Sequence, residues 1–238
     1  MTKYLPIVFN RYIKSFFYFW MKFFDLLKLV PLASLIRARS FSQFWEDRMI
    51  LKILGSGVGS YVDIGAGSPI WGSNTFLFYK LGWRGVTVDP IKFNVFLHRV
   101  FRSKDFQYKS LVSSESSIKT FYELSPWELS TTDPQVLEKQ IKNGAILVKS
   151  SLLRTITLED IYQSHSMSHP HFLSIDVEGH EMSVLLGMNF SYFKPDLICV
   201  EEHDNPIDGS RISDFLKMHG YFLHRYNGVS TIYILDRP

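Results

Sequence analysis

Acidic side chains follow two apolar segments in the second half of the chain. Asp176 and Glu178 come directly after one apolar run, and Glu201 comes after the next. The carboxyl ends of parallel strands meet at one edge of an α/β sheet, where ligands bind. We therefore expect these three carboxylates and His180 to lie together, where one of them can take a proton from a hydroxyl nucleophile. Solvated loop charges, or carboxylates favoured at a helix N-terminus, are the alternative reading.

The same groups suggest a second way to activate a hydroxyl. Asp176, Glu178, Glu201 and His203 are ligand types suited to Mg²⁺ or Mn²⁺. Their spacing matches no named metal motif. The sequence therefore disfavours the alternative of a divalent metal, and it does not assign metal ligands.

A glycine turn in the first half of the chain predicts a nucleotide-type cofactor. Gly65, Ala66 and Gly67 stand between an apolar run and a predicted helix, and a β-branched run ends at Asp89. Glycine in such a turn lets the backbone approach a ligand that a Cβ would keep away. A carboxylate at the end of the second strand can accept both hydroxyls of a ribose.

Features that the turn lacks narrow the choice of nucleotide. Ile70 replaces the third glycine of a dinucleotide fingerprint, and no Lys-Ser or Lys-Thr pair follows Gly72 as in a phosphate-binding loop. Asp63 would repel a pyrophosphate but favour a sulfonium, which points to S-adenosylmethionine. Asn74, after the turn, and Ser113, after the third predicted strand, complete the candidate cofactor contacts.

Four segments resemble the FkbM family of class I methyltransferases. They are DIGAG at 63–67, GWRGVTVDP at 82–90, TLED at 157–160 and SIDVEGHE at 174–181. The last is the most specific, since the glycine turn alone is common to many Rossmann-like enzymes. The resemblance implies methyl transfer from S-adenosylmethionine to a hydroxyl, typically of a sugar, glycan or polyketide-type acceptor.

Two other functions compete with the methyltransferase. One is a catalytically idle cofactor-binding protein, or a scaffold attached to a membrane. The other is an NAD-dependent oxidoreductase, which Ile70 disfavours. The presence of Asp63, Gly65, Asp89 and Asp176 favours the enzyme.

Composition limits the class of protein. The 238 residues are 46% hydrophobic and 21% charged, as expected for one globular α/β domain. Cys199 is the only cysteine, so no intrachain disulfide is possible and a cytoplasmic location is the default. Outside its first 40 residues the chain is mildly acidic, which argues against nucleic-acid binding.

The first 40 residues carry seven Lys or Arg and one Asp. Residues 10–30 combine a polar stripe at helical spacing with a wide aromatic face, and Lys22, Asp25 and Lys28 interrupt any membrane span. The predicted amphipathic helix packs on the enzyme body or on a second copy, or it lies in the plane of a membrane at its inner face. The oligomeric state stays open.

The elements that position these residues alternate between strand and helix. We expect a Rossmann-like class I methyltransferase fold in residues 41–238, with a mainly parallel seven-stranded sheet and a C-terminal antiparallel hairpin turning at Asn227-Gly228. An insert at 113–155, with a strand at 118–123, either folds over the acceptor or is a surface elaboration. The predicted strands are 61–64, 86–89, 107–112, 172–175, 197–200, 221–226 and 231–235, and the helices are 41–53, 74–81, 93–101, 134–142, 158–163, 180–186 and 210–219.

Overall fold

The structure is a computed structural model that describes residues 39–165, 170–202 and 205–237. The helix predicted at 10–30 and the candidate ligand His203 lie outside these ranges. Residues 40–238 form one compact unit. In the part of the chain that is described, no helix is both long and apolar enough to cross a membrane.

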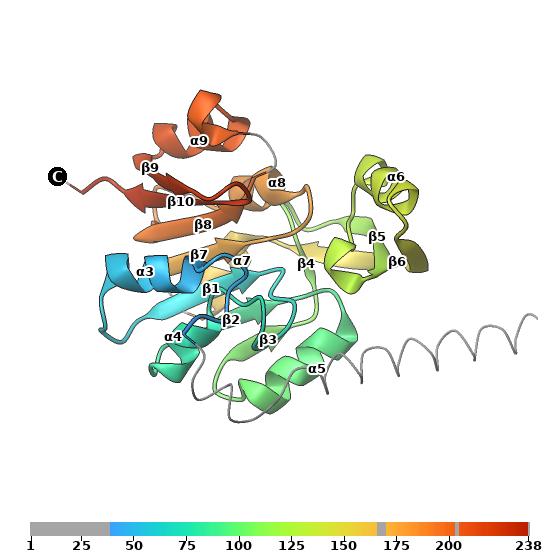
Figure 1. Ribbon diagram of the computed structural model, residues 1–238, viewed down its shortest axis with the longest axis horizontal. Helices are drawn as coiled ribbons and strands as arrows, with labels where there is room; N and C mark the ends of the chain where they lie inside the picture. Colours follow the sequence, from blue (N-terminus) through green and yellow to red (C-terminus); the bar gives the residue numbers. More distant parts are fainter. Residues whose placement is uncertain (1–38, 166–169, 203–204, 238) are drawn as a thin grey trace, which may run out of the picture. The chain divides into compact units, whose positions relative to one another are not determined.

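A seven-stranded sheet forms the centre of this unit (Figure 1). Its order is β3-β2-β1-β7-β8-β10-β9, and β10 runs antiparallel to both of its neighbours while the pairs from β3 to β8 are parallel. The predicted fold class is therefore confirmed. The strands are β1 (Ser60–Ile64), β2 (Arg84–Val88), β3 (Phe106–Tyr108), β7 (Phe172–Ile175), β8 (Leu197–Glu201), β9 (Tyr221–Tyr226) and β10 (Ser230–Leu235).

Helices cover both faces of this sheet, and two of them, α7 and α9, begin at a side-chain N-cap. Thr157 and Asp160 form a reciprocal capping box, and the Ser210 hydroxyl accepts from Ser213 N. The helix expected at 41–53 begins only at Glu46, because Trp45 is left-handed with φ 70°. The helices are α3 (Glu46–Leu54), α4 (Phe76–Lys80), α5 (Lys92–Phe101), α7 (Leu158–Ser164), α8 (Glu181–Leu186) and α9 (Arg211–Met218), with a short η2 (Pro206–Asp208).

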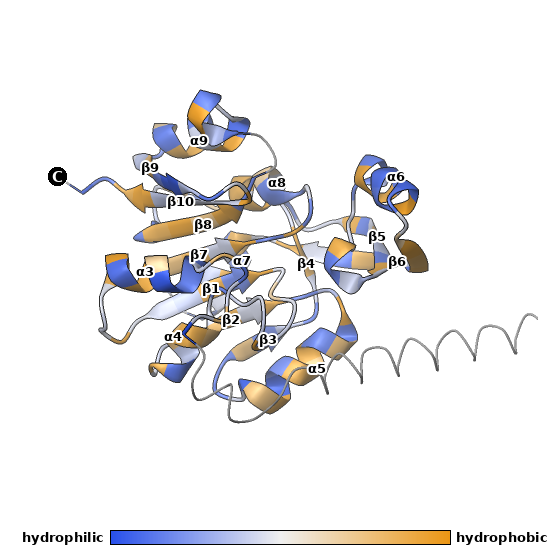
Figure 2. Ribbon diagram, in the orientation of Figure 1, coloured by the Kyte–Doolittle hydropathy of each residue, from blue (hydrophilic) through white to orange (hydrophobic). Residues whose placement is uncertain are grey.

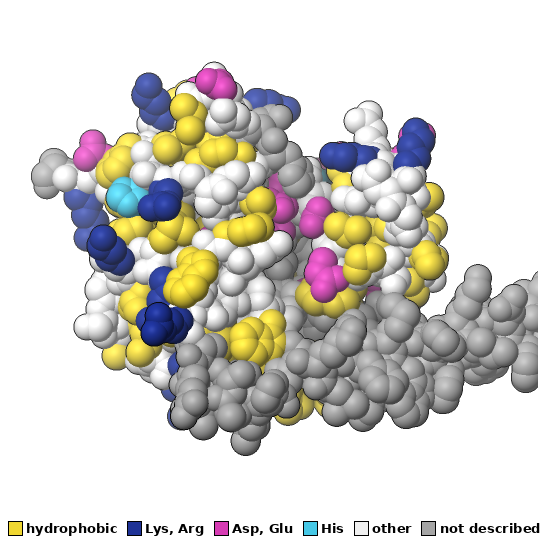
Figure 3. Space-filling view, in the orientation of Figure 1, with side chains coloured by type: hydrophobic (Ala, Val, Ile, Leu, Met, Phe, Trp, Pro, Cys, Tyr) yellow, Lys and Arg dark blue, Asp and Glu magenta, His cyan; other side chains and the backbone are white. Residues whose placement is uncertain are grey.

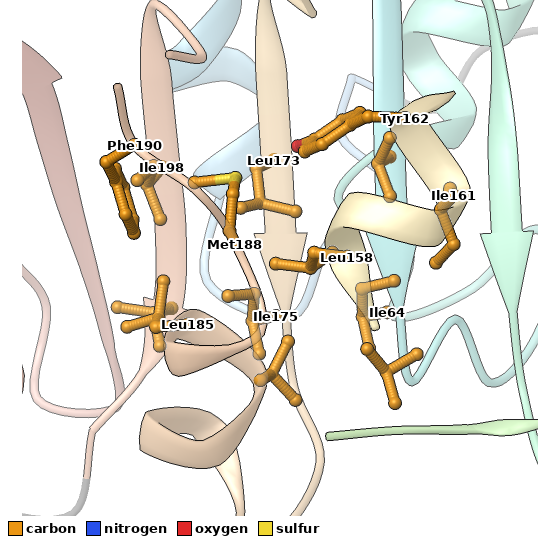
Figure 4. Close-up of a cluster of buried hydrophobic side chains, with 14 of the residues drawn as sticks. Ile64, Leu158, Ile161, Tyr162, Leu173, Ile175, Leu185, Met188, Phe190 and Ile198 are labelled. Atoms are coloured by element: carbon orange, nitrogen blue, oxygen red, sulfur yellow. The ribbon is translucent and has the colours of Figure 1, made fainter. Parts of the chain in front are cut away.

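Neighbouring residues of a strand enter different cores, since side chains alternate between the two faces of a sheet. Val62 belongs to a cluster packed against α7 and α8, whereas Tyr61 belongs to a second cluster with side chains of α3 and α4. Figure 4 shows side chains of α7, β7 and α8 directed at one another in the first cluster. Of these strands, β8 is hydrophobic along most of its length (Figure 2). Cys199 is buried in the second cluster, as predicted.

The insert is a small sheet of its own, which the sequence predicted only in part. The strand expected at 107–112 is wrong: the chain leaves the main sheet after Tyr108, and Leu111 and Val112 pair elsewhere. The long strand β6 was missed, because most of its side chains are exposed and no clear alternation marks it. The elements are β4 (Leu111–Val112), β5 (Ile118–Ser125), η1 (Trp127–Leu129), α6 (Pro134–Lys142) and β6 (Ile146–Ile156), with strand order β4-β6-β5.

Candidate active site

Three carboxylates meet at the carboxyl edge of the main sheet. One oxygen of each of Asp176, Glu178 and Glu201 lies within 4.8 Å of the others. Asp176 and Glu178 follow β7, and Glu201 ends β8, so pairing of these parallel strands brings them together. Figure 3 shows acidic side chains facing a hollow between the main sheet and the insert. His180 is not part of this cluster.

The loop that carries Glu178 is held in an unusual backbone conformation. Glu178 has φ 54°, in the left-handed region that a non-glycine residue seldom adopts, and Gly179 follows at φ 98°. The buried Glu181 carboxylate accepts from Val177 N at 3.2 Å and from Gly179 N at 3.0 Å. Thr131 of the insert donates to the Glu178 carbonyl at 2.9 Å. These three hydrogen bonds fix where the Glu178 side chain begins.

The cluster is costly to ionise. Burial, and next the Glu201 carboxylate, raise the pKa of Asp176 well above its usual range. Burial and the Asp176 carboxylate raise the pKa of Glu178 to about 8. Burial and the Glu178 carboxylate raise the pKa of Glu201 to about 7, although a hydrogen bond with Asp176 opposes the shift. The Asp176 side chain is nevertheless exposed to solvent, and Glu178 and Glu201 are half-buried, so the group does not lie in a sealed core.

Like charges so close together favour a cation or a shared proton. A hydrogen bond between the Asp176 and Glu201 carboxyl groups requires a proton on one of them, so the two acids titrate together. Carboxylate oxygens at this spacing are suited to a divalent metal, a bound organic cation or a proton in transit. The predicted convergence of the three acids is thus seen in the structure.

The glycine turn lies directly against the acidic loop. A Cβ on Gly65 would stand 1.7 Å from the Asp176 carbonyl oxygen, so the close approach required here is to the protein backbone. Both Gly65 and Ala66 donate their N–H groups to the Val88 carbonyl. A Cβ on Gly67 would meet the Trp127 ring at 2.8 Å, which places part of the insert on the turn.

Asp89 supports the same turn from the second strand. Its buried carboxylate accepts from Gly67 N at 2.9 Å, Ile91 N at 2.7 Å and Asn94 Nδ2 at 3.1 Å. His98 lies behind the turn with Nε2 3.2 Å from the Gly67 carbonyl oxygen, and burial lowers its pKa to about 3. Asp89 therefore has a structural task besides the ribose contact that the sequence predicts.

Comparisons with known proteins agree with this geometry. The model of the family described as "Methyltransferase FkbM domain" matches residues 63–224, which include the turn, Asp89 and the three carboxylates. The chain belongs to the FkbM methyltransferase family. No curated protein matches the FkbM chain described here.

The chain is also similar to solved structures. Methyltransferase FkbM from Methylobacillus flagellatus KT aligns with a TM-score of 0.52 and 14% identity, over 82% of this FkbM chain. The chain spans only 48% of the length of that structure. An O-methyltransferase from Bacillus cereus, in complex with SAH, aligns with a TM-score of 0.41 and 12% identity over 89% of each chain.

A buried arginine beneath the turn of this FkbM domain escaped the sequence analysis. Arg102 pairs with Asp105 at 2.9 Å and with Asp63 at 4.0 Å, and it donates to Tyr61 and Thr75. Burial raises the pKa of Asp63, against the effect of the Arg102 guanidinium. Asp63, proposed to favour a sulfonium, thus already faces one cation inside the protein. The nearest sequence signal was the i, i+3 spacing of Arg102 and Asp105 at the end of a helix.

His180 and Ser113 bind each other and the insert. The Ser113 hydroxyl lies 3.2 Å from His180 Nε2, and Lys119 Nζ lies 2.9 Å from the same nitrogen. Burial and the Lys119 charge lower the pKa of His180, so this nitrogen accepts as part of a neutral imidazole. Ser113 is fully buried. Lys119, on the strand predicted at 118–123, was not singled out from the sequence.

Asn74 points across the sheet edge and does not cap its helix. Its Nδ2 donates to the Ser174 hydroxyl at 3.2 Å, while the Ser73 hydroxyl accepts from Phe76 N at the start of α4. The predicted helix start at Asn74 is therefore two residues early. Asn74 lies near the strand that leads into the acidic loop.

Proposed function

We propose that this chain is an S-adenosylmethionine-dependent methyltransferase that acts on a hydroxyl of a sugar, glycan or polyketide-type acceptor. The observation that carries the proposal is the contact between the glycine turn and the cluster of Asp176, Glu178 and Glu201. It brings a nucleotide-type site and a set of proton acceptors into one crevice. Membership of the FkbM family supports the methyltransferase class.

The residues present suit this cofactor. Asp89 follows the end of β2, where a ribose is bound in folds of this kind. Three carboxylates with raised pKa values favour a cation beside them. When bound, S-adenosylmethionine supplies an electrophilic methyl group on a positively charged sulfur. The candidates for further cofactor contacts remain Ala66, Asn74, Asp63 and Ser113. Asp63 and Ser113 would act through the side chains that they contact, Arg102 and His180.

The carboxylates are suited to take the acceptor proton. A general base works best when its pKa lies near the operating pH, and Glu201 and Glu178 have pKa values of about 7 and about 8. Asp176 and Glu201 are hydrogen-bonded to each other, so a proton taken by Glu201 can be passed within the cluster. Alignment of two bound reactants accounts for about 7–11 kcal/mol of an activation barrier. A general base raises the rate by roughly 10²–10⁴-fold, which corresponds to a smaller reduction of the barrier. Positioning of the hydroxyl by these groups should dominate.

A direct test compares Asp176→Asn with wild type in cofactor binding and in methyl transfer. We expect calorimetry to show retained binding of S-adenosylhomocysteine, together with methyl transfer slowed about 10²-fold or more. Asp214→Asn, an exposed change on α9, is the matched control and should keep full activity. Wild-type rates in Asp176→Asn would refute the assignment of this group.

The acceptor class needs a separate experiment. The purified chain is incubated with labelled methyl donor and host extract, and label is sought in glycan, lipid-linked saccharide, small-molecule, protein and nucleic-acid fractions. Label that enters a saccharide or polyketide and is removed by acid cleavage of a methyl ether supports the proposal. Saturable binding of NAD without binding of S-adenosylmethionine would instead support an oxidoreductase, and binding without transfer to any fraction would support an idle protein.

A further inference from the structure

The outer surface of α5 and of the segment after it is unusual in composition. Within residues 92–109 no acidic side chain is exposed, because the one acid in this range, Asp105, is buried against Arg102. The exposed side chains are four cationic, four large and apolar, and one serine. They are Lys92, Phe96, Arg99, Val100, Phe101, Ser103, Lys104, Phe106 and Lys109, which we call the α5 surface.

The apolar members of this surface are truly outside the core. Phe96 and Val100 are each 56% exposed, and Phe106 is 59% exposed. Residues of α5 that do face the core are others, including Val95 and Leu97. The helix therefore has a second apolar stripe that no described element covers.

Cations and apolar side chains share this stripe. Lys92, Phe96, Arg99 and Val100 stand at positions i, i+4, i+7 and i+8 and so lie on one helical face. Phe106, at the start of the edge strand β3, extends the surface beyond the end of α5. Bulky apolar side chains framed by Lys and Arg are the composition of protein segments that lie at the boundary of an anionic bilayer.

We propose that the α5 surface binds an anionic lipid surface. Charge decides between this partner and a second copy of the chain, because a second copy presenting the same cationic surface would be repelled. A nucleic acid would match the charge but would leave the apolar side chains in water.

The location of this surface connects it to the crevice. α5 begins two residues after the Asp89 loop, and Asp89 accepts hydrogen bonds from Ile91 N and from Asn94 in its first turn. The same carboxylate accepts from Gly67 N in the glycine turn. The first turn of α5, which carries Lys92, therefore lies next to the glycine turn, whereas Phe101 lies at the opposite end of the helix.

Flotation of the full chain with vesicles tests the proposal. Phosphatidylcholine vesicles are compared with vesicles that also contain phosphatidylglycerol, using wild type, Arg99→Glu with Lys104→Glu, and a matched control, Arg211→Glu with Lys217→Glu. The control changes the same charges at exposed positions of α9. We expect the α5 variant to bind anionic vesicles about thirtyfold or more weakly than wild type and the control to change far less, since each basic residue lost contributes about fivefold.

A second pair of variants tests the apolar part. Phe96→Ser should weaken vesicle binding on the order of tenfold, whereas Met218→Ser, at a position 77% exposed on α9, should not. Melting temperatures within a few degrees of wild type establish that all variants are folded. Equal binding of wild type and α5 variants, or equal binding to both vesicle types, would overturn the proposal. The proposal would also be overturned if the α5 variants changed only the dimerisation of the chain, measured by sedimentation. It would be overturned as well if the wild type bound a DNA duplex more tightly than vesicles.

Discussion

The affinity for S-adenosylmethionine should rise steeply with pH, because the proposed site binds a cation beside acids that are hard to ionise. Glu178 has a pKa of about 8 and Glu201 a pKa of about 7, both raised first by burial and then by a neighbouring carboxylate. A cation favours the ionised forms, so its binding lowers these pKa values and releases protons. Binding should therefore strengthen from pH 6 to pH 8 and level off above.

The size of the effect follows from the pKa values. If the cation requires Glu178 ionised, affinity changes about tenfold for each pH unit well below that pKa, or about fiftyfold between pH 6 and pH 8. If Glu201 alone matters, its lower pKa limits the change to about tenfold over the same range. Because Asp176 and Glu201 titrate together, a total between about tenfold and fiftyfold is the expectation.

Calorimetric titration across this pH range, in buffers of different ionisation enthalpy, measures both affinity and proton release. S-adenosylhomocysteine is the control ligand, since its sulfur is uncharged and its affinity should change little. Glu178→Gln should flatten the curve for S-adenosylmethionine. Parallel curves for the two ligands would refute the reasoning, because they would show that the sulfonium does not sense the carboxylates.

Four further outcomes can be checked. Gly65→Ala should cost about 3 kcal/mol or more in urea unfolding, because its Cβ meets backbone, whereas Gly72→Ala has the same φ of +74° but open space and should cost about 1–2 kcal/mol. Arg102→Met should destabilise by about 3–5 kcal/mol, since it leaves buried acids unpaired, and a smaller loss would mean that they become protonated at little cost. Because the pKa of Glu178 is raised in the folded state, the ionised form of Glu178 opposes folding. Glu178→Gln should therefore match wild type in melting temperature below about pH 4 and exceed it as pH rises to about 8. The opposite trend would contradict the raised pKa. Methyl transfer should survive a chelator, and loss of activity restored by Mg²⁺ would instead show a metal at Asp176.

Much of the fold could be predicted because local signals in the sequence are strong. Apolar runs bounded by glycine or acidic residues marked β1, β7 and β8, and Asp133 followed by Pro134 marked the start of α6. β6 was missed because its exposed side chains carry no burial pattern, and the strand expected at 107–112 was wrong because two pairings divide it. Exposed and divided strands take their conformation from partners, which a linear pattern does not contain.

The candidate site divides in a similar way. The sequence predicted that Asp176, Glu178 and Glu201 converge, since the ends of adjacent parallel strands meet at one edge. It did not predict that Gly65 packs on the Asp176 carbonyl or that Trp127 covers Gly67, because both contacts join segments far apart in the chain.

The sequence alone thus determined the class of fold, the family and the chemical types gathered at the sheet edge, all of which depend on residue type and local spacing. Only the tertiary structure decided the state of those groups. The pKa values of the acids, the pairing of Asp63 with Arg102 and the attachment of His180 to Lys119 depend on burial and on distances between remote residues. Electrostatic energies vary with these distances and with access to water, and neither is written in the order of the residues.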